Sequence, residues 1–296
     1  MSAPRNGRQC TMREIGRGAV VLRVAMLAAL VALSGTLPGK AAELPLWEVG
    51  AGVAAIDFPH YRGSDQRQTY VLPLPHLVYR GKLLEADRDG VRGLFFRTRR
   101  AELHVSLNGS IPVDSSDNRA RTAMPDLDPT FEIGPSLEIA LWRTQGDTVR
   151  LELRLPARTV IATDLSSFHN VGWVFQPLLN ADLSDTALGP AWNLGLGAGP
   201  VFGDKRYHNH FYGVPADFAT PVRPAYRAEG GYGGFQLLAT ASRRFGDWWI
   251  GGFARGDTLS GAVFEDSPLI RQNYSVAVGL ALTRVLKRSS RFVAEK

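Results

Sequence analysis

Thr148-Val-Arg-Leu-Glu-Leu-Arg-Leu155 is the stretch of this sequence that decides the fold. Side chains of an extended strand alternate between two faces, so four apolar side chains lie on one face and Arg150, Glu152 and Arg154 on the other. About a dozen later and earlier segments repeat this alternation, and many of their non-apolar faces carry Gly, Ala or Ser. An apolar outer face with a small or charged inner face is typical of a transmembrane β-barrel.

Residues 1–41 are predicted to be a signal peptide. An Arg-rich segment precedes the apolar run Val24–Leu33, and Gly39-Lys40-Ala41 supplies small residues before a cleavage point. The apolar run is well short of the roughly 20 residues that a membrane-spanning helix needs. We therefore expect export from the cytoplasm, with cleavage near Ala41.

The signal peptide also accounts for the basic character of the sequence. The whole chain has 34 Lys and Arg against 28 Asp and Glu, but six of the basic residues and one acid lie in residues 1–41. The remainder, with 28 basic and 27 acidic residues, is nearly neutral, so no nucleic-acid partner is expected. The single cysteine, Cys10, lies in the same segment, which leaves no disulfide or cysteine-bound metal after cleavage.

Residues 42–286 divide into extended segments whose connections alternate in length. Most segments approach the ~9–11 residues with which a tilted strand crosses a membrane. The twelve expected strands are 47–54, 70–79, 82–86, 91–98, 102–108, 131–141, 148–155, 170–181, 191–202, 231–244, 248–255 and 272–286. Short turns are expected at 80–81, 99–100, 144–147, 183–189 and 246–247, and outer loops at 59–68, 87–90, 112–129, 158–169, 203–230 and 258–271.

Only two of these eleven connections break the alternation of short periplasmic turns with long outer loops, a pattern that a soluble β-sandwich has no reason to show. Tryptophans fall mostly near strand ends, where an aromatic girdle belongs. The sequence therefore predicts an all-β, antiparallel transmembrane barrel of 10–12 strands, most simply 12, forming one domain. A polar tail, residues 287–296, is expected to follow it.

Short motifs recur near the front, in the longest connection and in the last hairpin. The first group is Tyr61-Arg62-Gly63-Ser64, Pro73-Leu74-Pro75 and Tyr79-Arg80-Gly81. The second is Tyr207, Phe211-Tyr212-Gly213-Val214, Tyr226 and Gly230-Gly231, and the third is Arg255-Gly256-Asp257 with Asp266-Ser267-Pro268-Leu269-Ile270. Together they resemble the MltA-interacting protein MipA and its OmpV-type relatives.

This resemblance implies a protein embedded in the lipid of the outer membrane of a Gram-negative bacterium. It also implies a non-catalytic scaffold that joins a lytic transglycosylase to a bifunctional penicillin-binding murein synthase. The best-matching motifs lie in predicted outer loops, whereas murein enzymes would meet the short periplasmic turns. Members of the family commonly end on an aromatic residue, whereas here the last strand ends near Val285-Leu286 and a basic tail follows.

Five charged residues are expected to face the lumen. They are Glu132, Glu138, Arg150, Glu152 and Arg154. A barrel of twelve strands lies between those filled by side chains and those that hold channels, so the charges either pair across strands or line a narrow aqueous path. Pairing is expected, because opposite charges in a low-dielectric interior are costly to leave apart. A small-solute pore remains the first alternative function, and an adhesin or receptor built on loop 203–230 the second.

Several polar residues could suggest chemistry. His104 and Ser106 share one strand face, but an acyl hydrolase needs a Ser–His pair oriented by a third group, and none is evident. We expect a lumen hydrogen-bond network instead. His208 and His210, with His60 elsewhere, lack a third metal ligand of recognisable spacing.

Two further patterns are also weak. Asp126 and Asp128 lack the dense oxygen spacing of a calcium loop, and the alternating Gly195, Gly197 and Gly199 follow a strand rather than a dinucleotide fingerprint. The sequence thus predicts no enzymatic activity, no cofactor and no metal site.

Overall fold

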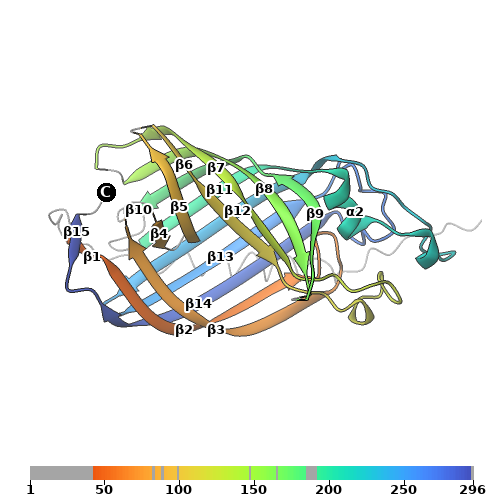
Figure 1. Ribbon diagram of the computed structural model, residues 1–296, viewed down its shortest axis with the longest axis horizontal. Helices are drawn as coiled ribbons and strands as arrows, with labels where there is room; N and C mark the ends of the chain where they lie inside the picture. The colour runs from red at the N-terminus through yellow and green to blue at the C-terminus, as the bar shows by residue number, and fades with distance from the viewer. Residues whose placement is uncertain are drawn as a thin grey trace, which may run out of the picture.

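The computed structural model describes residues 43–81, 84–87, 90–98, 100–146, 148–164, 166–184 and 192–294. The predicted signal peptide therefore lies outside the described residues. Fifteen strands and one α-helix are seen in these ranges (Figure 1). The strands are β1 Glu43–Pro45, β2 Trp47–Pro59, β3 Arg67–Arg80, β4 Leu84–Asp87, β5 Gly90–Arg97, β6 Ala101–Ser110, β7 Thr130–Arg143, β8 Val149–Thr163, β9 Phe168–Phe175, β10 Leu178–Ser184, β11 Trp192–Gly203, β12 Gly231–Phe245, β13 Trp248–Thr258, β14 Tyr274–Arg288 and β15 Phe292–Ala294, and the helix is α2 Lys205–Tyr212.

Thirteen of these strands form one antiparallel sheet whose pairings return on themselves. Consecutive strands pair from β2 to β9 and from β10 to β14, and β14 pairs with β2. β8 and β11 each pair with both β9 and β10, which makes β9 and β10 two halves of one interrupted strand. The interruption falls at Gln176-Pro177, because proline has no N–H to give to a ladder. The predicted antiparallel barrel with twelve strand positions is thus confirmed.

The distribution of polar and apolar side chains is the reverse of that in a water-soluble protein. Most apolar residues of the strands point outward, and Val71 and Leu280 are each 69% exposed. Charged residues point into the barrel, where Glu48 is fully buried and Asp257 is 4% exposed. Lipid favours such an apolar exterior, and the lumen takes up the polar groups. Among the described residues, no helix has the length and apolar character needed to cross a membrane.

Aromatic residues gather near the two ends of the strands on the outer surface. Phe245 and Trp248 flank the short turn between β12 and β13, whereas Phe168 and Tyr274 begin strands at the end with the long loops. Guanidinium groups cover some of the rings at the short-turn end, with Arg243 4.4 Å from the centre of the Phe245 ring. These are the two aromatic girdles expected at membrane interfaces, and the short turns mark the periplasmic end.

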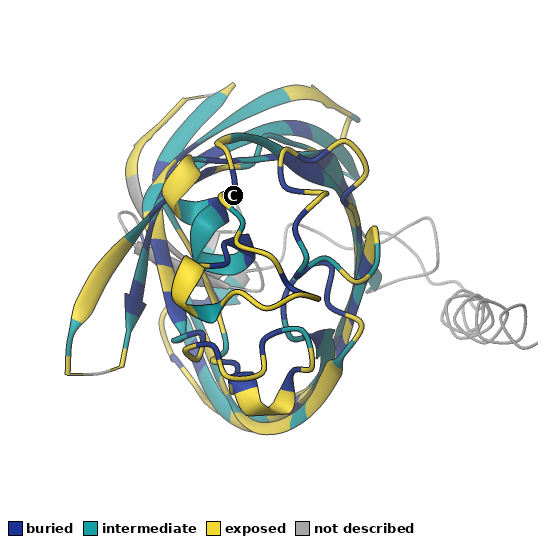
Figure 2. Ribbon diagram, turned by 90° about the vertical axis from the view of Figure 1, so that its right-hand side faces the viewer, coloured by how far each residue is buried: buried dark blue, intermediate teal, exposed yellow. Residues whose placement is uncertain are grey.

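Four outer connections fold together into a cap at the other end of the barrel. We call residues 60–66, 111–129, 204–230 and 259–273 the outer cap. Figure 2 views the barrel from this end and shows the connections crossing its mouth. The largest hydrophobic core of the described residues lies here, not within the strands: Tyr61, Val113, Met124, Leu127, Tyr212, Val214, Ala228, Leu259, Ala262, Phe264 and Leu269.

Three details of the expected strand layout are wrong. The loop expected at 158–169 is only 164–167, because β8 continues to Thr163 and β9 begins at Phe168. The single strand expected at 170–181 is broken by Pro177 into β9 and β10. The last barrel strand runs to Arg288, and part of the expected polar tail forms β15, which pairs with β1 beyond the barrel. The side chains of β1 and β15 show no alternation, and backbone hydrogen bonds between the two strands hold this ribbon together.

Candidate functional site: the charged lumen and the outer cap

The centre of the lumen is organised by one arginine. Arg154 of β8 reaches carboxylates from three strands: Glu138 of β7 at 3.3 Å, Glu152 of β8 at 3.3 Å and Asp182 of β10 at 3.2 Å. Arg150, four residues earlier on β8, approaches the same group, with its Nε 3.7 Å from Glu152. Because the guanidinium has five donors in a planar fork, it can serve several acceptors at once.

A second arginine, Arg158, lies four residues further along β8, on the same strand face. Its Nε donates to Glu132 at 2.8 Å, and its two terminal nitrogens donate to Ser106 at 3.2 Å and to Gln176 at 3.0 Å. Asn108 also donates to Glu132, at 3.1 Å. The five charges expected in the lumen are therefore all placed there, each within reach of an opposite charge. Ser106 accepts a hydrogen bond from an arginine rather than from His104.

A third cluster lies near the periplasmic end of the lumen. The fully buried carboxylate of Glu48 is 3.0 Å from Arg80 and 2.5 Å from Arg244. His76, on the neighbouring strand, shares a hydrogen bond of 3.0 Å with Thr283. Glu48 lies in the first strand expected from the sequence, 47–54, but its partners were not predicted, since Arg80 was assigned to a turn and Arg244 to the end of a strand.

The remaining wall of the lumen, from β11 to β14 and β2, is built from small residues and two aromatic rings. The ring of Trp249 leans over Gly251 and that of Phe253 over Gly279, so that a Cβ at either glycine would collide with the ring. A cavity of about 290 Å³ lies along this wall. Its polar lining includes Asp182, Asn193, Thr240 and Ser242, so it adjoins the Arg154 group.

The family-motif residues at the outer end meet in the cap. Tyr61 donates to the carbonyl of Leu269 at 2.8 Å, and Ser267 donates to the carbonyl of Tyr212 at 2.7 Å. Arg62 and Arg255 both face Asp257, at 3.0 and 3.2 Å. Gly63 has φ +92°, a conformation that other residues rarely adopt, and the Leu259 and Ile270 side chains would collide with a Cβ there.

The other motif residues are divided between cap and barrel. Ser64 is buried and accepts a hydrogen bond from Asn118 at 3.2 Å, and Val214 pairs with Tyr226 across an isolated bridge. Gly213 ends α2, whereas Asp266 is exposed and Pro268 half-buried on the cap. Tyr79, Arg80 and Gly81 lie at the periplasmic end of β3. Motifs that are scattered in the sequence therefore come together mainly in the cap.

Two arginines hold the cap connections together through backbone carbonyls. Arg223 donates to Ala120 at 3.0 Å and to Thr122 at 2.9 Å, joining connection 204–230 to connection 111–129. Arg121 donates in the opposite direction, to Phe211 at 3.4 Å. Burial lowers the pKa of Arg121, although an arginine stays charged at any ordinary pH. These bonds satisfy backbone carbonyls of the cap that no strand ladder reaches.

Histidines in the cap are expected to make it sensitive to acid. Burial, assisted by the nearby Arg121, lowers the pKa of His210 from 6.5 to about 4, and burial also lowers that of His208. An unfolded cap binds these protons at higher pH than the folded cap. The stability of the cap is therefore complete above about pH 6.5 and falls as the pH drops toward 4.

Limited proteolysis of the purified barrel at stepped pH measures this effect. Cleavage within residues 204–230 should rise as the pH falls from 7 to 5, and His210→Gln, which does not titrate, should reduce the rise. The protease used should remain active at low pH, and comparing the two proteins at each pH removes the effect of pH on the protease itself. Equal profiles for the two proteins would exclude His210 as a source of the effect.

The remaining candidates for chemistry are separated in space. His60 bonds Asn118 at 3.1 Å, and His208 bonds the carbonyl of Glu229 at 2.7 Å. Asp126 accepts from the backbone N–H of Ser115 at 2.7 Å, a contact within its own loop. His104 instead faces Glu138, at 3.8 Å. Gly195, Gly197 and Gly199 lie on the lumen side of β11, opposite Thr240, Leu238 and Gln236.

Two groups of residues were not predicted from the sequence. Arg158 was assigned to a loop, although its even number places it on the same strand face as Arg150 and Arg154. Extending the alternation of the decisive stretch by four residues would have found it. The cap core has no such signal, because its members follow neither period 2 nor period 3.6.

Several solved structures are similar to this chain. The NanC porin covers 81% of this chain and 100% of its own, with 8% identity and a TM-score of 0.38. The CymD monoaromatic hydrocarbon channel (10% identity, 81% and 89% covered) and a FadL homologue of Pseudomonas aeruginosa (9% identity, 88% and 97% covered) each give a TM-score of 0.30. Scores this low support no conclusion about cargo. No curated protein matches the chain.

A protein-family model matches most of the chain. The model of the family described as MltA-interacting protein MipA matches residues 49–286, which span the barrel from β2 to β14 and include all of the outer cap. The motif residues of the cap and Arg80, the partner of the buried Glu48, lie within this range. The chain is an outer-membrane β-barrel protein that belongs to the MipA family of MltA-interacting proteins.

Proposed function

We propose that this protein is a non-catalytic scaffold of the outer membrane that holds murein-remodelling enzymes at its periplasmic end. The observation that carries the proposal is the family match across the whole barrel, since the family is named for binding MltA, a lytic transglycosylase. A penicillin-binding murein synthase would be the second enzyme of the assembly. Paired lumen charges and a packed outer cap favour a barrel that serves as a support rather than as a passage.

The ribbon formed by β1 and β15 is the surface that we assign to the partner. It lies beyond the barrel wall at the periplasmic end (Figure 1) and is anchored by hydrogen bonds from Leu46 N–H to the Arg291 carbonyl and from Arg80 N–H to the Leu46 carbonyl, each 2.8 Å. Phe292 on this ribbon is 51% exposed. Exposed aromatic residues are common anchors of protein interfaces, and a two-stranded ribbon has open edges.

Affinity capture from cross-linked cells tests the proposal. The tagged protein should enrich a lytic transglycosylase above an unrelated outer-membrane barrel, and Phe292→Asp should reduce that enrichment at least fivefold. Val222→Asp is the matched control, because Val222 is 90% exposed on the outer cap, which faces away from the periplasm. Recovery of the barrel alone, or equal loss in both variants, would count against the scaffold.

Export belongs to the same proposal. We expect the signal peptide to be removed near Ala41, which would leave β1 next to the new N-terminus. Amino-terminal sequencing of the protein from outer membranes checks the position. A chain that retains residues 1–41 would contradict it.

A narrow pore is the second candidate, and the cavity beside Asp182 and Thr240 is the observation that favours it. Planar bilayers distinguish the two functions. A scaffold should insert without conductance steps, whereas a pore should conduct and respond to Arg150→Ala, which alters the charge beside the path without removing the central Arg154.

A further inference from the structure

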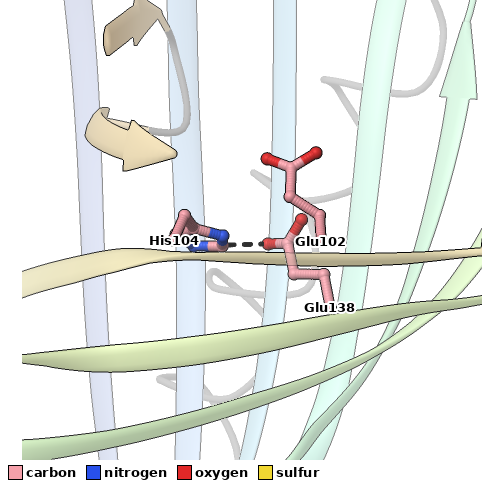
Figure 3. A group of neighbouring side chains, drawn as sticks. All are labelled: Glu102, His104 and Glu138. Atoms are coloured by element: carbon pink, nitrogen blue, oxygen red, sulfur yellow. Dashed lines mark ion pairs between the residues drawn. The ribbon is translucent and has the colours of Figure 1, made fainter. Parts of the chain in front are cut away.

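Two carboxylates and one imidazole converge on one point of the lumen wall. Glu102 and His104 lie two residues apart on β6, so they share its inner face, and Glu138 lies directly opposite Glu102 on β7. One ligand atom from each lies within 4.8 Å of the other two. Figure 3 shows the imidazole of His104 directed at the carboxylate of Glu138, and the Glu102 carboxylate beside them.

The pairing of Glu102 with Glu138 needs a counter-charge. Like charges directly opposite each other on antiparallel strands repel. Arg97 lies 2.5 Å from one oxygen of Glu102, and Glu138 shares Arg154 with two further carboxylates. The other oxygen of Glu102, Oε1, is buried and accepts no hydrogen bond within the part of the chain that the structure describes. A buried carboxylate oxygen of this kind is costly without a partner.

The geometry points to a divalent cation held by Glu102, His104 and Glu138, and we propose this as a metal site in the lumen. Zinc binds imidazole nitrogen and carboxylate oxygen at about 2.0–2.2 Å in a tetrahedral arrangement, which places ligand atoms about 3.3 Å apart. His104 Nε2 and Glu138 Oε1 are 3.8 Å apart, so they need to approach by about half an ångström. Glutamate side chains can rotate through such a distance without a change in the strands.

The donor set selects the class of cation. Imidazole suits zinc and the later transition metals, whereas calcium and magnesium prefer oxygen ligands alone. Three protein ligands leave a fourth position open toward the lumen, as in zinc sites that also bind water. The cation would join β6 to β7 and remove the repulsion between Glu102 and Glu138. Arg154 would keep its contacts with Glu152 and Asp182.

Calorimetry of the full chain, purified in detergent without a histidine tag and stripped of metal with a chelator, tests the site. We expect one Zn²⁺ per barrel, and at least tenfold weaker binding in His104→Ala and in Glu138→Gln. His76→Ala is the matched control, because it removes a lumen histidine that bonds Thr283 in a different cluster. Its affinity should equal that of the wild type.

A second readout separates this site from weak binding elsewhere. Co²⁺ in the site should give the visible absorption of a low-coordinate nitrogen and oxygen ligand set, lost in His104→Ala. Zn²⁺ should also raise the unfolding temperature of the wild type but not of Glu102→Gln, which keeps the side-chain shape and should assemble normally. Absence of Zn²⁺ uptake by the wild type, or binding and stabilisation unchanged in all three variants, would overturn the proposal.

Discussion

Replacing Arg154 with methionine is expected to lower the free energy of unfolding of the barrel by about 3–5 kcal/mol. The guanidinium of Arg154 lies within 3.3 Å of Glu138, Glu152 and Asp182, and its side chain is only 20% exposed. Methionine fills a similar volume but leaves the three carboxylates facing one another. Removal of one partner from a buried charge group costs more than the group contributes when intact.

Urea unfolding of the barrel reconstituted in lipid vesicles measures the loss, and Arg150→Met is the matched control. Arg150 lies on the same strand face, but it is 40% exposed and approaches a carboxylate only at 3.7 Å. Its loss should therefore cost less than about 1 kcal/mol. Equal destabilisation by the two substitutions would mean that water in the lumen screens Arg154 as well. In that case, adding Glu152→Gln to Arg154→Met should not recover any of the lost stability.

The barrel could be predicted because nearly every strand shows the alternation of apolar and polar side chains that a barrel in a membrane requires. A strand between lipid and lumen must alternate, so the seven residues from Val149 to Leu155 show the alternation, and β11 repeats it with Leu194 and Leu196 against Gly195 and Gly197. Alternation does not predict where the strands end. Thr163 and Phe168 continue β8 and β9 into the expected loop, where hydrogen bonds between the two strands are enough to keep the chain extended.

The sites were less predictable, because they depend on contacts between residues far apart in the chain. Glu48 meets Arg244 across 196 positions, and Tyr61 meets Leu269 across 208. The register of the strands decides these contacts, and alternation alone says only which face a residue occupies. Glu102 faces Glu138 for the same reason, and a one-residue shift in the β6–β7 pairing would separate them. Membership of the family, by contrast, could be predicted from local motifs.

Replacing Phe264 with alanine is expected to destabilise the outer cap by about 3–5 kcal/mol while leaving the strands paired. Phe264 is fully buried and stacks on Tyr212 with ring centres 3.7 Å apart, and the ring of His208 meets it at 4.7 Å. The cap core consists of connections, whereas the barrel is held by its own closed ladder of hydrogen bonds. The cap should therefore open as a separate unit.

Hydrogen exchange followed by peptide identification checks this, with faster exchange expected in 111–129, 204–230 and 259–273 and unchanged exchange in β12 to β14. Phe245→Ala, at a ring that is 49% exposed on the outer surface, controls for the loss of a phenyl group and should leave the cap protected. If the cap is what closes the barrel, Phe264→Ala should also produce conductance that the wild type lacks, because only the paired lumen charges would then remain in the path. Capture of the murein enzyme should persist in the same variant, since the β1–β15 ribbon lies at the opposite end. Loss of both cap protection and enzyme capture would instead mean that the two ends are coupled through the barrel, which the separation of cap core and strand ladder argues against.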